Sequence, residues 1–272
     1  MVIDLWVNAI SGRAAEKFLG QTGYGEIEGF FGSTVRGGTS RSDLLDAMDR
    51  LGVDRAVLTS TLSSVPEETL ALVADHRDRL LLAATVDHPE QPRRQSTSIR
   101  SRASDGTIDM VRVTPLVQQL PLNDALYYPV YATCEELGIP VSINIGIPGP
   151  RVRSRCQDPV LLEDVLIDFP ELVVIGAHMG HPYEELLIQY MLKWPNLYLS
   201  NSAYSAKYMH PALVTFMGSS RGSGRVLFAS DHPFLPMDRA LAAAKALPLS
   251  NQAMAEFLGG AAERLFDDSS GG

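Results

Sequence analysis

Cysteine is scarce in this sequence, which has only two, Cys134 and Cys156, among 272 residues. Two cysteines are too few to hold a fold of this size together by disulfides, and no spacing typical of structural zinc is present. Basic residues are also in deficit, because 23 Lys and Arg stand against 32 Asp and Glu, a net charge of −9. An acidic chain does not attract polyanions, so we expect no nucleic acid partner.

Long hydrophobic runs are missing too. No segment reaches the roughly 18 consecutive apolar residues that a membrane span requires, and the apolar start of the chain has no basic segment and is interrupted by Asp4. These absences predict a protein without a membrane segment or a secretory signal. Together with the two cysteines, they favour a reducing, cytoplasmic location.

What the sequence does contain is a repeated alternation of short apolar runs with amphipathic segments. The eight runs cover residues 2–7, 56–59, 81–86, 110–114, 141–145, 172–177, 197–200 and 226–229. Most are continuously apolar and rich in Val, Ile and Leu, which is typical of parallel strands covered on both faces. Helical spacing of apolar residues falls between them, at residues 43–51, 66–79, 124–137, 158–168, 182–193 and 211–217.

This alternation predicts the fold class. Eight strands with intervening helices in about 270 residues match a (β/α)₈ TIM barrel. The alternative, an open doubly wound sheet, normally carries a Gly-rich GxGxxG motif after its first strand, and none follows residues 2–7. We predict a single domain over residues 1–266 and a flexible tail over residues 267–272.

In a TIM barrel the chemistry lies at the carboxyl ends of the strands and on the loops that follow. Polar residues of several types stand at such positions here, and we expect them to converge at one end of the barrel: Asp4, Asn8, Arg112, Asn144, His178 and Asp231.

Several motifs resemble the amidohydrolase-related family. They are Val-Ile-Asp-Leu-Trp-Val-Asn (2–8), Ile-Gly-Ala-His-Met-Gly (175–180), Asn-Leu-Tyr-Leu-Ser-Asn-Ser-Ala (196–203), Val-Leu-Phe-Ala-Ser-Asp-His-Pro (226–233) and the closing Phe-Leu-Gly-Gly-Ala-Ala-Glu-Arg-Leu-Phe (257–266). This branch of the amidohydrolase superfamily contains aminocarboxymuconate semialdehyde decarboxylase, resorcylate-type decarboxylases and pyrone-dicarboxylate lactonase. The resemblance covers nearly the whole chain in the right order and also implies a TIM barrel.

The chain departs from the metal-binding pattern that the resemblance implies. The family places Asp-x-His-x-His on strand 1, a His at the ends of strands 5 and 6 and an Asp at the end of strand 8. Here Trp6, Asn8 and Asn144 stand where histidines are expected, and only His178 and Asp231 match. Two strong ligands hold a transition metal weakly, and the Trp6 indole would take up the space of a metal. We therefore predict no metal and no other cofactor.

Two residues are candidates for catalysis. Asp231 ends an apolar strand, where partial burial raises the pKa of a carboxyl and makes it a better general base; alternatively it caps the following loop. His178 stands among small residues, where it can handle a proton or polarise a carbonyl. Its alternative is a core histidine hydrogen bonded to Asp231 or to a backbone carbonyl.

Five further residues are candidates for substrate binding. Arg112 lies in a strand too apolar for an unpaired cation, so it needs either a buried carboxylate or a substrate carboxylate, which its guanidinium can bind with two hydrogen bonds. Asn8 and Asn144 can donate hydrogen bonds to a substrate oxygen, or simply fill the barrel. Trp6 projects into the barrel mouth, and Tyr204 either closes over the site or is an ordinary loop aromatic.

Residues 9–40 contain eight glycines and several aromatic residues, a composition suited to a lid over the site or to packing against the barrel or a second subunit. We expect a small, anionic substrate and a homodimer. The first functional hypothesis is a metal-independent, lactonase-like hydrolase of a small cyclic carboxylated lactone or amide. The alternatives are a decarboxylase, another lyase or an isomerase on the same barrel, and a catalytically silent ligand-binding barrel.

Overall fold

The computed structural model describes residues 1–8 and 41–267. The lid expected over residues 9–40 and the end of the predicted tail, residues 268–272, lie outside this part. Eight parallel strands form one sheet in sequence order. They are β1 (Ile3–Val7), β2 (Arg55–Thr61), β3 (Leu80–Thr85), β4 (Met110–Val113), β5 (Val141–Asn144), β6 (Val174–Ala177), β7 (Leu197–Ser200) and β8 (Val226–Leu227).

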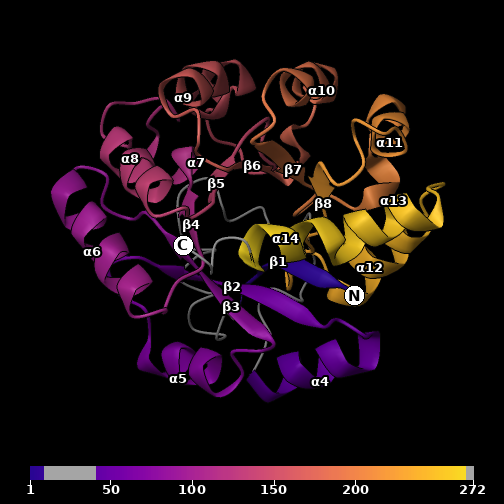
Figure 1. Ribbon diagram of the computed structural model, residues 1–272, viewed down its shortest axis with the longest axis horizontal. Helices are drawn as coiled ribbons and strands as arrows, with labels where there is room; N and C mark the ends of the chain where they lie inside the picture. The colour runs from indigo at the N-terminus through magenta and orange to yellow at the C-terminus, as the bar shows by residue number, and fades with distance from the viewer. Residues whose placement is uncertain (9–40, 268–272) are drawn as a thin grey trace.

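Hydrogen bonds between β1 and the chain after β8 close this sheet into a ring. The amide of Leu5 donates to the carbonyl of Phe228 (3.1 Å), and the amide of Asp231 donates to the carbonyl of Trp6 (2.8 Å). Helices surround the ring on the outside (Figure 1). The predicted (β/α)₈ TIM barrel is therefore confirmed, and each of the eight apolar runs overlaps one strand.

The helices of the described residues fall mostly where apolar spacing predicts them. They are α4 (Arg41–Leu51), α5 (Glu67–Asp75), α6 (Pro92–Ser104), α7 (Pro115–Gln118), α8 (Tyr128–Glu136), α9 (Leu162–Asp168), α10 (Glu184–Lys193), α11 (Pro211–Met217), α12 (Met237–Lys245), α13 (Asn251–Ala255) and α14 (Ala261–Asp267). None of them is long and apolar enough to cross a membrane. Apolar spacing did not predict α6, α7, α12, α13 or α14. Of these, α6 buries only Gln95 and Ile99 and so has almost no apolar stripe.

One end of the barrel is closed by the C-terminal part of the chain. Ala261, Ala262 and Phe266 of α14 pack in one apolar cluster with inward-facing strand residues such as Ile3 and Leu5. Figure 1 shows α14 over the centre of the ring, beside β1. A Cβ added at Gly259, just before α14, would lie 2.9 Å from the carbonyl oxygen of Met1. The C-terminal segment that closes the barrel therefore lies at the start of β1. The opposite end, where the strands finish, holds the cavity.

Candidate functional site

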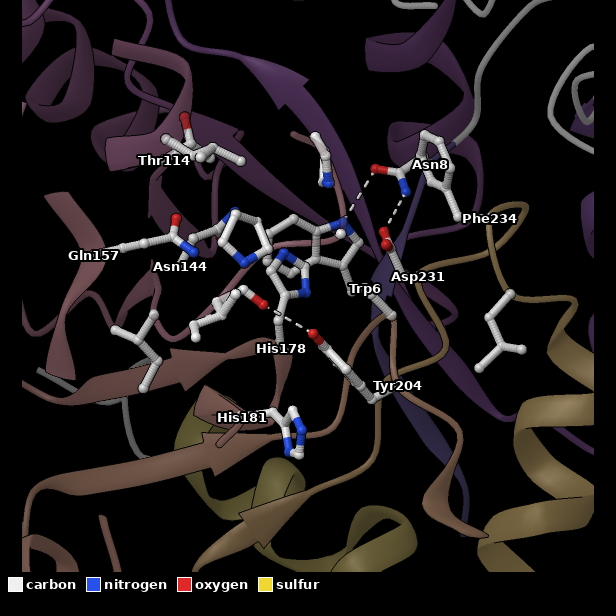
Figure 2. A pocket seen from close by; sticks show the side chains of 18 of the residues that line it. Trp6, Asn8, Thr114, Asn144, Gln157, His178, His181, Tyr204, Asp231 and Phe234 are labelled. Carbon is white, nitrogen blue, oxygen red and sulfur yellow. Dashed lines mark hydrogen bonds between the residues drawn. The ribbon is translucent and has the colours of Figure 1, made fainter. Parts of the chain in front are cut away.

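A cavity of about 790 Å³ opens at the carboxyl ends of the strands (Figure 2). Its walls are largely apolar, and among the described residues that line it there is no Lys or Arg. The lining residues are Trp6, Asn8, Thr114, Leu116, Val117, Asn144, Ile145, Ile147, Pro148, Gly149, Pro150, Gln157, His178, His181, Ala203, Tyr204, Ser205, Tyr208, Asp231, Phe234 and Leu235. Of the seven residues that we predicted for the site, only Arg112 is not part of this lining.

Asp231 is the acidic group of the cavity. Its side chain is 8% exposed, and its backbone is in the left-handed region (φ 66°), a costly conformation for a residue other than glycine and one that is often found at functional sites. Oδ1 accepts a hydrogen bond from Asn8 Nδ2 (2.7 Å), whereas Oδ2 is hydrogen bonded to none of the described residues. Burial raises the pKa of Asp231 to about 8, against the lowering effects of the Asn8 hydrogen bond and the Arg112 charge.

Two residues of the first strand orient this carboxyl group. The indole Nε1 of Trp6 donates to Asn8 Oδ1 (3.1 Å). Because an indole nitrogen can only donate, the oxygen of the Asn8 amide must face Trp6, and the amide nitrogen is then turned toward Asp231. The dashed lines in Figure 2 follow this chain of three side chains. Asn8 and Trp6 therefore act on Asp231, in addition to lining the cavity as predicted.

We expect Trp6→Phe to lower kcat by about 2- to 10-fold, the value of one ordinary hydrogen bond, once a substrate is identified. The phenyl ring can still cover Arg112, but it cannot donate to Asn8, so the amide is free to turn its oxygen toward Asp231. The matched control is Trp194→Phe, which changes the other tryptophan, outside the cavity lining. Unchanged kcat and an unchanged pH profile in Trp6→Phe would show that the indole does not position Asn8.

His178 is also in the left-handed region (φ 62°), and its ring lies 4.8 Å from that of Trp6. Its Nδ1 is 3.2 Å from the carbonyl oxygen of Ser202 and 3.0 Å from the Ser202 hydroxyl. A carbonyl can only accept, so we assign the ring hydrogen to Nδ1 and leave Nε2 as an acceptor. Burial lowers the pKa of His178 to about 4, and the ring is neutral at physiological pH. This tautomer suits the predicted proton-handling role better than polarisation of a carbonyl.

Arg112 lies beneath the cavity, covered by Trp6. The centre of its guanidinium is 3.6 Å from the centroid of the indole ring, one terminal nitrogen donates to the carbonyl of Leu5 (2.7 Å), and the side chain is 1% exposed. Burial lowers its pKa to about 9, against the charges of Asp231 and Asp4, so it remains a cation at neutral pH. Of the two predicted partners, this placement favours the buried carboxylates and gives no support to binding of a substrate carboxylate.

Asp4 helps to close the barrel and does not line the cavity. It is fully buried, and its Oδ1 accepts hydrogen bonds from the backbone amides of Trp6 (3.2 Å) and Ser230 (2.8 Å). These bonds tie β1 to the segment that carries Asp231. Burial raises the pKa of Asp4 to about 6. Asp4 and Arg112 lie under the cavity and interact electrostatically with Asp231 in its wall.

Tyr204 crosses the edge of the cavity. Its hydroxyl donates to the carbonyl of Ile147 (3.0 Å), and its ring lies 5.7 Å from that of His181. His181 in turn is 2.7 Å from Glu184 through Nδ1. Tyr204 therefore links the loop after β7 to the loop after β5 at the edge of the cavity.

Thr114 and Gln157 are among the lining residues that reasoning from the sequence missed. Thr114 directly follows β4, so its position at a strand end could have indicated it. Gln157 lies far from any strand in a short helical turn, η1 (Arg155–Gln157), and reaches the cavity only because the loop after β5 folds back: Gln157 Nε2 donates to the carbonyl of Gly146 (2.8 Å). No feature of the sequence indicates that the loop after β5 folds back to the cavity.

The residues of this site do not fit a metal ion. The described residues contain no group of three His, Cys, Asp or Glu side chains that could hold one. The one ligand atom of Asn8, Oδ1, is already occupied by the Trp6 indole, and its nitrogen faces Asp231. That leaves His178 and Asp231, fewer than the three protein ligands of typical catalytic zinc sites.

We expect protein purified without chelators to carry far less than one equivalent of zinc, iron or manganese, because two strong ligands do not retain these ions through purification. Elemental analysis of the purified protein measures this directly. Any activity should also survive treatment with EDTA. A stoichiometric metal whose removal abolishes activity, and whose return restores it, contradicts this expectation.

Comparisons with known proteins agree with the fold. The chain matches no curated protein. It is similar to three solved structures: an uncharacterised TIM-barrel protein of Bordetella bronchiseptica (24% identity, 99% of each chain, TM-score 0.80), a 5-carboxyvanillate decarboxylase of Sphingomonas paucimobilis (17%, 98% of each chain, 0.73), and a dihydroxybenzoic acid decarboxylase of Polaromonas sp. JS666 with bound manganese (16%, 98% of this chain and 96% of that chain, 0.73). At these identities the likeness establishes the fold alone.

A sequence profile described as amidohydrolase matches residues 37–267. This match covers most of the chain, and it includes Asn144, His178 and Asp231. The expected resemblance is thereby confirmed: the chain belongs to the amidohydrolase family.

Proposed function

We propose that the protein is a hydrolase of a small cyclic ester or amide and that it works without a metal, with Asp231 as the general base. One observation carries this proposal: a buried carboxyl group, oriented by Asn8, presents its second oxygen to a cavity large enough for a small molecule. In the ionised state Asp231 can take a proton from water as the water attacks the carbonyl carbon, and it can return that proton to the leaving group.

The surroundings of Asp231 support this role. The raised pKa of about 8 gives a stronger base than an ordinary carboxylate, close to the pH at which a general base works best. His178 is neutral and can accept a hydrogen bond through Nε2 from water or from a ligand. Asn8 is committed to Trp6 and Asp231, so its amide is not available to polarise the substrate carbonyl.

The pH dependence of turnover tests this assignment. If Asp231 is the base, kcat/KM should rise with pH and level off above a midpoint of about 8, because only the ionised carboxylate can accept a proton. Ring opening of a panel of lactones, lactams and cyclic imides, followed by absorbance or NMR across neutral and alkaline pH, measures this. A rate that falls as pH increases through that midpoint excludes Asp231 as a base.

A decarboxylase is the second candidate, and one observation favours it. With a pKa of about 8, Asp231 is mostly protonated at neutral pH, and a protonated carboxyl group can deliver the proton that replaces CO₂ on carbon. The similar decarboxylases of Sphingomonas and Polaromonas share the barrel. The two candidates predict opposite pH dependences, because a decarboxylase that needs protonated Asp231 loses activity above the same midpoint of about 8.

A barrel that binds a ligand but catalyses no reaction is the third hypothesis, and any turnover excludes it.

A further inference from the structure

One wall of the cavity carries hydrogen-bonding atoms that find no partner among the described residues. Gln157 is 1% exposed, and its amide orientation is fixed because Nε2 donates to the carbonyl of Gly146 (2.8 Å), which only accepts. Its Oε1 is then an acceptor by necessity, and within the described part of the chain this atom is buried without a hydrogen-bond partner. The backbone amide of Gly146 donates back to the Gln157 carbonyl (2.9 Å), so this side chain is held in place.

Asn144 adds a second such atom. It ends β5, is 8% exposed, and its Oδ1 is likewise buried without a partner among the described residues. Thr114 lines the same wall, and although it precedes α7 its hydroxyl makes no capping hydrogen bond to that helix. Buried polar atoms in folded proteins are nearly always paired, so two unpaired amide oxygens in one cavity wall point to a ligand or an ordered water.

The charges around the cavity restrict what that ligand can be. Its described lining has no Lys or Arg, its carboxyl and imidazole groups are Asp231, His178 and His181, and the buried cation Arg112 is shielded by Trp6. A carboxylate entering here would meet acceptor oxygens on one wall and would find no Lys or Arg in the described lining to compensate its lost hydration. Unpaired charge and acceptor–acceptor contacts of this kind exclude ligands effectively.

We propose that Thr114, Asn144 and Gln157 form a subsite for an uncharged hydrogen-bond donor of the ligand, a ring hydroxyl or an N–H group, and that carboxylated ligands are excluded. Figure 2 shows this wall on the side of the cavity opposite Asn8 and Asp231, with Trp6 between them. A flat, neutral ring can therefore place its donor against the amide wall and its reacting carbonyl near Asp231. This inference rests on the proposed function only for the position of the reacting group.

Four coumarins that differ in one group test the subsite by calorimetric binding, without any turnover. In slightly acidic buffer, where its hydroxyl is protonated, 7-hydroxycoumarin should bind about fivefold more tightly than 7-methoxycoumarin, the value of one added hydrogen bond. Coumarin-3-carboxylate should bind more weakly than unsubstituted coumarin. A carboxylate that binds more tightly than coumarin, or four probes that all fail to bind, overturns the proposal.

Variants of Asn144 test whether this residue is responsible for the preference for the hydroxyl probe over the methoxy probe. In Asn144→Leu the preference for the hydroxyl over the methoxy probe should shrink toward equality, whereas Asn144→Asp, which keeps an acceptor, should retain it and bind the carboxylate still more weakly. The control Asn123→Leu changes an asparagine that donates to Asp164 and does not line the cavity. A preference that persists unchanged in Asn144→Leu and in Gln157→Leu overturns the subsite. Because binding is measured alone, a failed hydrolysis assay contradicts the proposed function and leaves this result standing.

Discussion

Asp231→Asn is expected to lower kcat by about 10²- to 10⁴-fold, the usual contribution of a general base or acid, while ligand affinity stays near that of the wild type. The amide has nearly the same size as the carboxyl group, and its oxygen can still accept from Asn8 Nδ2, which now lies 2.7 Å from Oδ1. It cannot take or give a proton. The loss should therefore appear in kcat rather than in KM, whichever of the two proposed reactions the protein catalyses.

The matched control for this substitution is Asp87→Asn. Asp87 also follows a strand, β3, and is hydrogen bonded to the backbone and hydroxyl of Ser63, but it does not line the cavity. Circular dichroism and binding of a neutral coumarin show whether each variant is folded and keeps its cavity. If Asp231→Asn turns over substrate at a rate close to wild type, the base lies elsewhere, and His178 is the next candidate.

The fold could be predicted from the sequence because each strand of the barrel is a short apolar run that ends in Gly, Pro or a polar residue. Positions at strand ends also identified the residues that approach the cavity: Asn8, Asn144, His178 and Asp231 all line it. Such an argument depends only on the direction of parallel strands, which places all their carboxyl ends together. It does not identify residues that a loop folds back into the cavity, and Gln157 was missed for that reason.

Depth within the barrel could not be predicted either. Arg112 and Thr114 are two residues apart, so both point inward, but Arg112 lies one layer deeper and Trp6 covers it. The sequence shows that Arg112 needs an anion without showing which one. The orientation of the Asn8 amide could not be predicted for a similar reason. It is set by the hydrogen bond from the Trp6 indole, and no pattern of residue types in the sequence specifies that hydrogen bond.

The second large effect is expected from Arg112→Met, which should lower the free energy of unfolding by about 3–5 kcal/mol, the usual cost of removing one partner from a buried group of charges. Methionine fills part of the space under Trp6 but leaves the Leu5 carbonyl without its donor and the carboxyl groups of Asp4 and Asp231 without their cation. Urea unfolding measures the loss. A suitable control is Arg225→Met, which removes a partly buried arginine that lies over Tyr198, with no buried carboxylate partner in the described structure.

The pH dependence of stability separates this role from binding of a substrate carboxylate. The pKa values of Asp4 and Asp231 in the folded protein, about 6 and about 8, lie above the ordinary value of 3.8. The folded state therefore binds more protons than the unfolded state, and the free energy of unfolding falls as pH rises from about 4 to about 8. Without the Arg112 charge both pKa values rise further, so this fall should be steeper and extend to higher pH. An unchanged slope, combined with a selective loss of affinity for coumarin-3-carboxylate, would instead identify Arg112 as the substrate anchor.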